Sequence, residues 1–175
     1  MRLLLTGIPG TGKTTVIRDV VKRLKEVRCA GFFTEERRRG GQRTGFKIVT
    51  LDGAEGTLAS AGEKEGPRVG KYTVHLEEFE KLVLPVLDPE ATPADLYVVD
   101  EIGKMELLSE KFTRQLIDLL ARPTSILATI AKKGRGLIEQ IKKRDDVELI
   151  ELTSANRDRL PEEIAERIAR EIVRS

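Results

Sequence analysis

The chain has 175 residues, and 31 Lys and Arg face 29 Asp and Glu, for a formal net charge of +2. This near balance excludes a strongly basic nucleic-acid coat protein and an acidic disordered tail. The apolar runs are far shorter than the ~20 residues of a membrane span, and the single cysteine excludes an intrachain disulfide. We therefore expect a cytoplasmic protein without a membrane segment, folded as one domain over residues 1–175.

The first predicted unit is a strand, a glycine-rich loop and a helix. Residues 2–6 form a short apolar run typical of a buried strand, and residues 7–12 contain three glycines. From Lys13 the apolar residues recur at helical spacing, in a stripe that continues to Val27. Residues 30–34 follow as a second strand.

An antiparallel hairpin is predicted next. Segments near 31–38 and 43–51 flank Gly40-Gly41, a dipeptide that favours a two-residue hairpin turn. Residues 54–71 are polar and contain four glycines, so we expect a long loop, which in a compact domain is often functional. Residues 72–75 then predict a short strand.

The remaining chain alternates helices and strands. Expected helices are 76–84, limited by Pro85, a helix with Ser109 as N-cap, a short helix near 137–141, and a final helix with Pro161 in its first turn. Expected strands are 96–99, 125–130 and 147–152. This alternation predicts an α/β three-layer sandwich with a mostly parallel sheet, to which the hairpin adds antiparallel strands at one edge.

Residues 7–14 match the phosphate-binding pattern G-x-x-x-x-G-K-[ST]. Glycines let several backbone N–H groups face one anion, and the N-terminus of the helix adds partial positive charge. We expect Lys13 to reach the β- and γ-phosphates, Thr14 to ligate Mg²⁺ and Thr15 to contact the α-phosphate. The expected nucleotide-binding residues of this segment are Gly7, Ile8, Pro9, Gly10, Thr11, Gly12, Lys13, Thr14 and Thr15.

A second motif places two carboxylates after a buried strand. Asp100, at the carboxyl end of this strand, is expected to hold Mg²⁺ opposite Thr14. Glu101 is expected to orient and deprotonate the water that attacks the γ-phosphorus, which makes Lys13 and Glu101 the expected catalytic residues. The arrangement resembles P-loop proteins with an additional strand, in which residues 125–130 would lie between the first strand and the Asp100 strand. Thr129 would then sense the γ-phosphate or the water.

Residues 99–107, together with 31–35, 45–49 and 156–158, resemble one family over essentially the whole chain. This family is the small nucleoside triphosphatases of thermophiles, which include the cancer-related nucleoside triphosphatase. The resemblance implies a kinase-like P-loop fold and Mg²⁺-dependent hydrolysis of several nucleoside triphosphates, ATP, GTP, CTP and UTP, to diphosphate and phosphate. It also implies a second nucleotide-binding segment, made of Tyr97, Val98, Val99, Asp100, Glu101, Ile102, Gly103 and Lys104.

Three polar groups have weaker signals. A glycine loop carrying Lys132, Lys133 and Arg135 resembles a kinase lid, where Arg135 would stabilise transition-state charge, or it is a solvated basic loop. The hairpin turn is surrounded by arginines that either meet an acidic partner or nucleic acid, or protect a solvated edge: Arg37, Arg38, Arg39 and Arg43. After the last strand, Asn156 and Arg157 are candidates to frame the base.

These patterns predict a Mg²⁺-dependent nucleoside triphosphatase that acts as a monomer on nucleoside triphosphates. Two alternatives stay open: a nucleoside or nucleotide kinase in which residues 54–75 close over an acceptor, and a nucleic-acid-associated ATPase or switch. Nucleic acid is the less favoured partner. One Asn and three Gln among many Arg and Glu form a composition typical of thermophiles.

Overall fold

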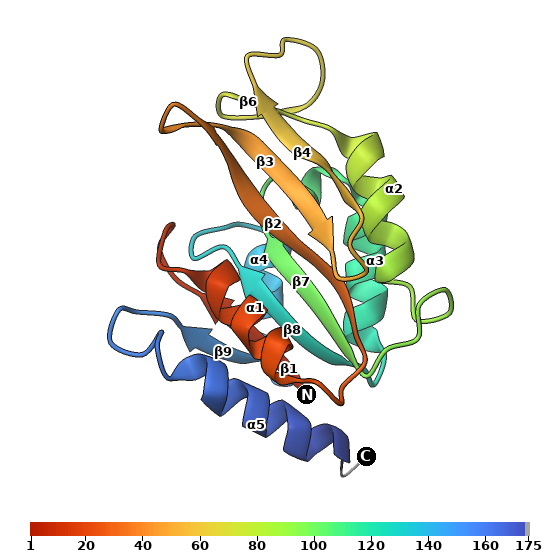
Figure 1. The fold of residues 1–175 in the computed structure, drawn as a ribbon. Helices are drawn as coiled ribbons and strands as arrows, with labels where there is room; N and C mark the ends of the chain where they lie inside the picture. Colours follow the sequence, from red (N-terminus) through yellow and green to blue (C-terminus); the bar gives the residue numbers. More distant parts are fainter. Residues whose placement is uncertain (174–175) are drawn as a thin grey trace.

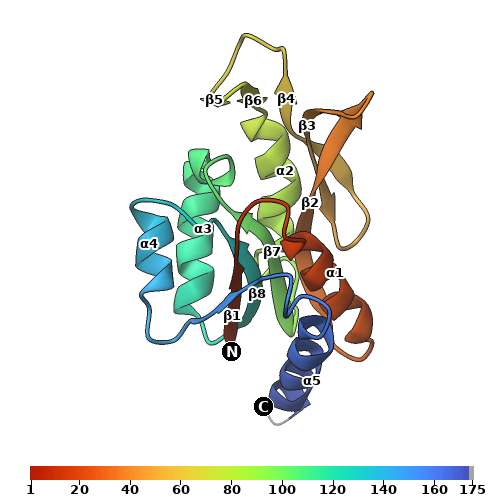
Figure 2. The same cartoon turned by 90° about the vertical axis from the view of Figure 1, so that its left-hand side faces the viewer.

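A computed structural model describes residues 1–173 of the chain. Nine strands of this part form one mixed sheet in the order β5-β6-β4-β3-β2-β7-β8-β1-β9. Helices α1 and α5 cover one face, and α2, α3 and α4 cover the other, so the expected three-layer α/β architecture is confirmed (Figures 1 and 2). No helix within residues 1–173 combines the length and the apolar composition that a bilayer span requires.

The elements have the following bounds. The strands are β1 (Arg2–Thr6), β2 (Cys29–Arg39), β3 (Gln42–Thr50), β4 (Glu55–Ala61), β5 (Arg68–Val69), β6 (Tyr72–Val74), β7 (Leu96–Ile102), β8 (Ser125–Ile130) and β9 (Glu148–Glu151). The helices are α1 (Lys13–Arg23), α2 (Leu76–Val86), the 3-10 helix η1 (Glu106–Leu108), α3 (Glu110–Ala121), α4 (Leu137–Lys142) and α5 (Leu160–Val173).

The parallel half of the sheet brings distant sequence motifs to one edge. Strand β8 lies between β1 and β7, as the additional-strand arrangement predicts, with Leu5 in register with Thr129 and Val99 with Ala128. Strand β2 pairs in parallel with the other side of β7. The carboxyl ends of β1, β7 and β8 therefore lie next to one another, where open α/β sheets bind their ligands.

The antiparallel half corrects one prediction. Residues 54–71 are not a loop, because β4 and β5 occupy much of this segment and pair with β3 and β6. The glycine at 56, which suggested a loop, permits a close approach: a Cβ there would collide with Leu82 of α2. Helix α2 also runs through Pro85 to Val86, because a proline in the last turn removes only one backbone donor.

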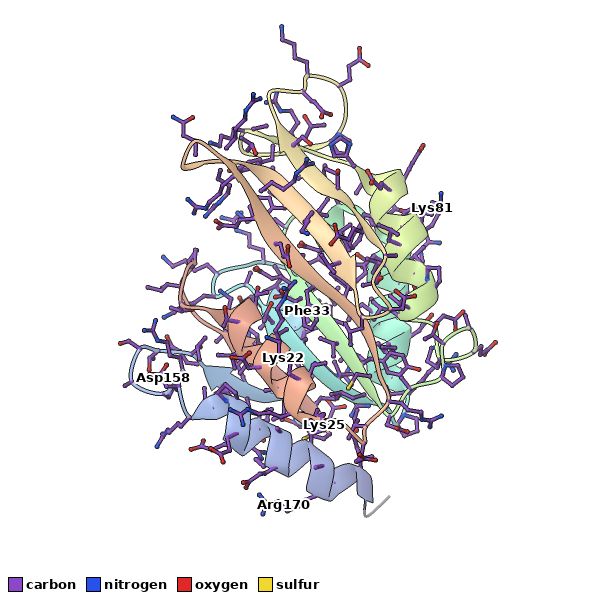
Figure 3. The ribbon with its side chains drawn as sticks, in the orientation of Figure 1. Lys22, Lys25, Phe33, Lys81, Asp158 and Arg170 are labelled. Carbon is purple, nitrogen blue, oxygen red and sulfur yellow. The ribbon has the colours of Figure 1, made fainter. Side chains whose placement is uncertain are left out.

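Two apolar cores hold the helices to the sheet. On the α2–α3 side, Phe32, Phe79 and Phe112 pack edge to face, with ring centroids 5.2–6.2 Å apart. Ser109 accepts a 3.0 Å hydrogen bond from the Phe112 backbone N–H, so its expected role as N-cap of α3 is confirmed. On the α1–α5 side, Phe33 lies between α1 and the sheet (Figure 3).

Candidate active site

The loop between β1 and α1 has the backbone of an anion site. Gly10 and Gly12 adopt φ angles of +83° and +93°, in the left-handed region that favours glycine. Thr11 donates hydrogen bonds to the Ile8 carbonyl from its backbone N–H (3.3 Å) and from its hydroxyl (2.9 Å). No side chain caps the N-terminus of α1. The first N–H groups and the dipole of α1 can therefore serve a phosphate.

Lys13 lies over this loop. Its Nζ donates hydrogen bonds to the carbonyls of Gly7 at 3.2 Å and Ile8 at 3.4 Å. Its charge also lowers the pKa of Glu101, against the burial that raises it. The ammonium group is thus placed between the phosphate loop and the second motif.

Asp100 lies where three elements meet. Its Oδ1 accepts a hydrogen bond of 2.7 Å from the Thr129 hydroxyl, and its Oδ2 accepts one of 3.3 Å from the Thr34 backbone N–H. Burial raises the pKa of Asp100, while hydrogen bonds from Thr129, Thr14 and Thr34 and the charge of Arg18 oppose the rise. The structure therefore brings Asp100 and Thr14 together, as a shared metal ion requires.

The donors at this point fit Mg²⁺. One carboxylate and one hydroxyl are the protein ligands that Mg²⁺ typically uses when phosphates and water complete its shell. Within residues 1–173, no three Asp, Glu, His or Cys side chains gather into a metal-binding group. A metal here would thus depend on the oxygens of a bound nucleotide.

Glu101 and Glu106 flank Gly103. A Cβ on Gly103 would lie 3.2 Å from Oε1 of Glu101 and 2.9 Å from Oε2 of Glu106, so glycine leaves the space that the two carboxyls occupy. Burial, followed by the charges of Glu101 and Asp100, raises the pKa of Glu106 to about 8. The pairing register of β7 with β8 shifts between Val99 and Ile102, and the Asp100–Glu101 peptide within this stretch is cis. Glu106 lies within residues 99–107, but the sequence pattern predicts no role for it.

The rest of the second segment is mostly core. The side chains of Tyr97, Val98, Val99 and Ile102 are at most 1% exposed. The Tyr97 hydroxyl donates to the Thr92 carbonyl at 2.9 Å, beyond the start of β7 and away from Asp100. Exposed Lys104 lies near Glu101 and Glu106. The segment thus offers a nucleotide mainly its two carboxylates, and the apolar residues hold them in place.

The largest cavity at this site lies between the phosphate loop and the β2–β3 hairpin. Its volume is about 780 Å³. The hairpin turn and the phosphate loop lie on the same edge of the molecule (Figure 1). The lining residues are Pro9, Gly10, Gly12, Lys13, Thr14, Thr15, Arg18, Thr34, Glu35, Glu36, Arg38, Arg43, Phe46 and Glu101. Sequence analysis missed Arg18, Thr34, Glu35, Glu36 and Phe46, because no spacing rule connects the hairpin to the loop.

Glu101 also lines a smaller cavity of about 260 Å³. The two cavities share Thr34, Phe46 and Glu101, and the walls of the smaller one are mainly apolar. Of the expected lid residues, Lys133 lines this smaller cavity, while Lys132 pairs with Glu151. Arg135 is exposed and lines neither cavity.

A third cavity, of about 380 Å³, lies on the other side of the phosphate loop. It combines Gly10 and Thr15 with Arg157 and Asp158 from the β9–α5 loop, where Figure 3 labels Asp158. Arg157 therefore lies beside the phosphate loop, and its role in framing the base stays a prediction. Asn156 instead shapes the turn: its side chain accepts from the Thr153 N–H at 2.8 Å and donates to the Glu151 carbonyl at 2.9 Å.

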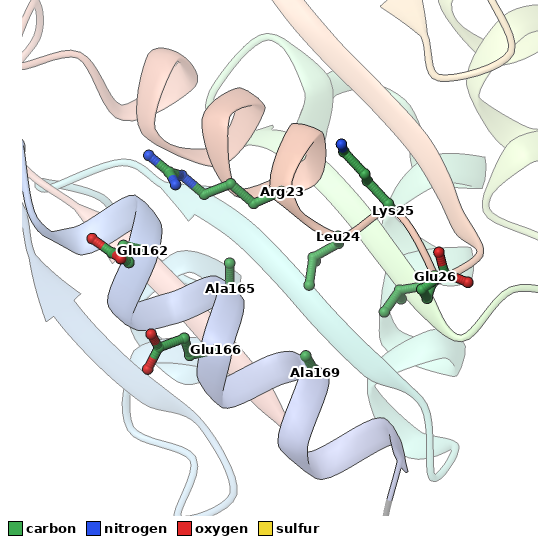
Figure 4. Close-up of a pocket in the computed structure, with 9 residues that line it drawn as sticks. Arg23, Leu24, Lys25, Glu26, Glu162, Ala165, Glu166 and Ala169 are labelled. Atoms are coloured by element: carbon green, nitrogen blue, oxygen red, sulfur yellow. The ribbon is translucent and has the colours of Figure 1, made fainter.

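A groove between α1 and α5 shares only Arg23 with the cavities described above. Figure 4 shows its lining by Leu24, Ala165 and Ala169, with charged side chains at its rim. It lies at the far end of α1, an 11-residue helix that is about 16 Å long at the usual rise. No phosphate-binding group reaches it.

Known proteins resemble this chain over nearly its whole length. A family model described as NTPase matches residues 2–165. The chain is 44% identical over 164 residues to the nucleoside-triphosphatase THEP1 of Thermotoga maritima, covering 94% of this chain and 93% of that protein. It is 44% identical over 173 residues to the human cancer-related nucleoside-triphosphatase, covering 90% of this chain and 91% of that protein.

Two solved structures share the fold. The crystal structure of THEP1 from Aquifex aeolicus superposes with a TM-score of 0.86 at 35% identity, covering 96% of this chain and 99% of that one. The solution structure of the human cancer-related nucleoside triphosphatase superposes with a TM-score of 0.80 at 43% identity, covering 95% and 96%.

Proposed function

Because the chain belongs to the NTPase family and is therefore a nucleoside triphosphatase, we propose that it uses Mg²⁺ and hydrolyses ATP, GTP, CTP and UTP with little base preference. The products are the nucleoside diphosphate and phosphate. Action as a monomer in the cytoplasm stays a prediction.

One observation carries the proposal. Lys13, Thr14 and Glu101 line one cavity of about 780 Å³, and buried Asp100 lies behind it in contact with Thr14. This volume lies within the range of small-molecule sites. The four residues supply the cation, the metal ligands and the carboxylate that phosphoryl transfer to water requires.

Each residue then has a distinct task. The loop N–H groups and Lys13 stabilise negative charge on the β- and γ-phosphate oxygens. Thr14 and Asp100 would hold Mg²⁺, which when bound neutralises charge on the same oxygens. Glu101 orients a water molecule toward the γ-phosphorus and accepts its proton, since the burial that raises the pKa of Glu101 makes it a better base than an exposed carboxylate.

Weak base preference follows from the third cavity. Its lining near the phosphate loop includes the charged residues Arg23, Arg157 and Asp158, of which Arg157 and Asp158 pair at 3.5 Å. Strong discrimination needs buried hydrogen-bonding groups that a wrong substrate leaves unpaired. Exposed charges of this kind give no such penalty, so the four common bases should be accepted similarly.

The test is Glu101→Gln, which keeps the size of the side chain but cannot accept a proton. We expect kcat for phosphate release to fall about 10²–10⁴-fold, the usual contribution of a general base, while Mg²⁺–nucleotide binding stays within threefold. Exposed Glu110→Gln is the matched control. A loss of kcat below about threefold in Glu101→Gln would contradict the assignment.

A panel of nucleosides and monophosphates completes the test. Phosphate release by the wild-type chain without any of these acceptors supports hydrolysis. Transfer to an acceptor that survives Glu101→Gln would favour the kinase alternative instead.

A further inference from the structure

We propose that the β2–β3 hairpin supplies, from within the same chain, two catalytic arginines, Arg38 and Arg43, and that Glu36 holds them when no nucleotide is bound. Their guanidinium groups would contact the γ-phosphate as its charge develops. The inference rests on the proposed function and extends it to the charge-stabilising groups of the transition state.

A bulge in the hairpin places Arg38 and Arg43 opposite each other, on the same face of the β2–β3 pair. The β2–β3 register pairs Arg37 with Gly45 and Arg38 with Arg43, so Thr44 is left over on β3. Thr44 is fixed there by a 3.2 Å hydrogen bond from its hydroxyl to the Arg37 carbonyl. Cross-strand partners project to the same face of a sheet, and bulges commonly redirect side chains beside active sites.

This face of the hairpin lines the cavity that lies next to the phosphate loop. Arg38 and Arg43 line the same cavity of about 780 Å³ as Gly10, Lys13 and Glu101. The ion pair between Arg18 of α1 and Glu35 of β2, at 2.5 Å, fixes the hairpin to the helix that follows the phosphate loop. The guanidinium of Arg18 also lies 4.7 Å from the centre of the Phe33 ring.

Glu36 explains how two like charges can share one face. Directly opposed like charges destabilise a strand pair. Glu36 compensates: its Oε2 accepts from Nε and Nη2 of Arg38 at 2.9 and 2.7 Å, and its Oε1 pairs with Arg43. The Nε of Arg43 is buried and has no hydrogen-bond partner among the described residues. The pair therefore retains unused donors and one uncompensated positive charge.

A γ-phosphate can compete for these donors. The Glu36, Arg38 and Arg43 side chains are 36–54% exposed, and ion pairs at such exposure contribute little free energy. Phosphate oxygens accept shorter, charge-assisted bidentate hydrogen bonds from guanidinium groups. Without the two arginines, Glu36 would remain in this cavity as an unpaired negative charge that opposes a triphosphate.

The strand provides matched controls. Arg37 and Arg39 alternate with Arg38 along β2 and do not line the cavity. Arg37 instead donates to the Thr57 hydroxyl on β4 at 3.4 Å. If the cavity arginines serve phosphate chemistry, replacing Arg38 and Arg43 should reduce activity more than replacing Arg37 and Arg39. If the hairpin is a general basic surface for nucleic acid, the two pairs should behave alike.

The experiment measures kcat, diphosphate affinity and binding of diphosphate with aluminium fluoride, which mimics the transferring phosphoryl group. For Arg38→Ala with Arg43→Ala we expect kcat to fall at least about 10²-fold and the aluminium fluoride complex to be lost, with diphosphate affinity within threefold. For the control, Arg37→Ala with Arg39→Ala, all three quantities should stay within threefold of the wild-type values. Glu36→Gln should lower KM for triphosphate several-fold, because it releases the arginines.

One further double variant separates charge from geometry. Arg38→Lys with Arg43→Lys keeps the charge of the strand pair but not the bidentate geometry, and should still lose the aluminium fluoride complex. A kcat within threefold of wild type in the alanine double variant, or equal losses in both arginine pairs, would overturn the inference. The inference about the arginines can fail while the proposed function stands. This is the outcome if the arginine variants contradict the inference but Glu101→Gln and Lys13→Ala are inactive in the same assay.

Discussion

The Thr129 hydroxyl donates its 2.7 Å hydrogen bond to Asp100 Oδ1 between two neighbouring parallel strands, where the two residues are 0% and 1% exposed. Because this hydrogen bond orients the carboxylate, we expect Thr129 to position Asp100, and its role as a sensor of the γ-phosphate or the water stays a prediction. The Thr34 N–H holds the other oxygen. The orientation of the carboxylate is thus set by β2 and β8 together.

Thr129→Val should weaken the binding of Mg²⁺ at the proposed Thr14–Asp100 site. The change keeps the side-chain volume but removes the hydroxyl, so the Mg²⁺ concentration for half-maximal phosphate release should rise about 10-fold, as for other residues that orient a metal ligand. Magnesium titrations of activity measure this shift. Thr124→Val, which loses a 2.9 Å bond to the Leu119 carbonyl away from the site, is the control. An unchanged titration would show that the hydrogen bond is only structural.

Lys13→Ala should abolish turnover without unfolding the protein. Its Nζ donates hydrogen bonds to the Gly7 and Ile8 carbonyls, so we expect a small stability change but a loss of kcat of about 10²–10³-fold. Triphosphate affinity should fall more than diphosphate affinity, because the missing charge served the γ-phosphate. Phosphate release and calorimetric titration check both. Lys22→Ala, exposed at the other end of α1 (Figure 3), should change neither.

Glu106 should make the chain less stable as pH rises. Its pKa is raised by burial from 4.5 to about 8, so between these values the folded chain keeps a proton that the unfolded chain releases. This contribution is fully present below pH 4.5, declines by up to about 1.4 kcal/mol per pH unit, and is lost as pH rises through about 8.

Glu106→Gln tests this linkage with a side chain of the same size. Urea unfolding at pH 5, 6, 7 and 8 should show a weaker decline of the unfolding free energy than in wild type, and a more stable variant at pH 8. Exposed Glu110→Gln should keep the wild-type decline. Parallel curves for Glu106→Gln and wild type would show that Glu106 does not titrate in this window.

Local chemistry allowed much of the fold to be predicted from the sequence. The β1–loop–α1 unit, the Ser109 cap and the position of β8 between β1 and β7 are confirmed, because each depends on short spacing or on a known strand arrangement. The loop prediction for residues 54–71 was wrong, since a glycine that permits close packing under Leu82 has the same sequence signature as a turn glycine.

The side of the candidate site that the β2–β3 hairpin forms could not be predicted from the sequence, for a different reason. The arginines around the turn were recognised, but a one-residue bulge at Thr44 decides which of them face the phosphate loop. Strict alternation would place Thr44 opposite Arg38. Glu106 was similarly hidden, because its burial beside Glu101 depends on the path of the chain through Gly103.

The position of β1 between β8 and β9 has a consequence for synthesis on the ribosome. Leu3, Leu4 and Leu5, all 0% exposed in the finished fold, are made before both of their neighbouring strands, which end at Ile130 and Glu151. At 5–20 residues per second, this apolar segment waits on the order of ten seconds for its partners. A nucleotide that needs the assembled sheet can therefore stabilise the fold only after β9 is made, and until then the apolar segment is exposed to aggregation.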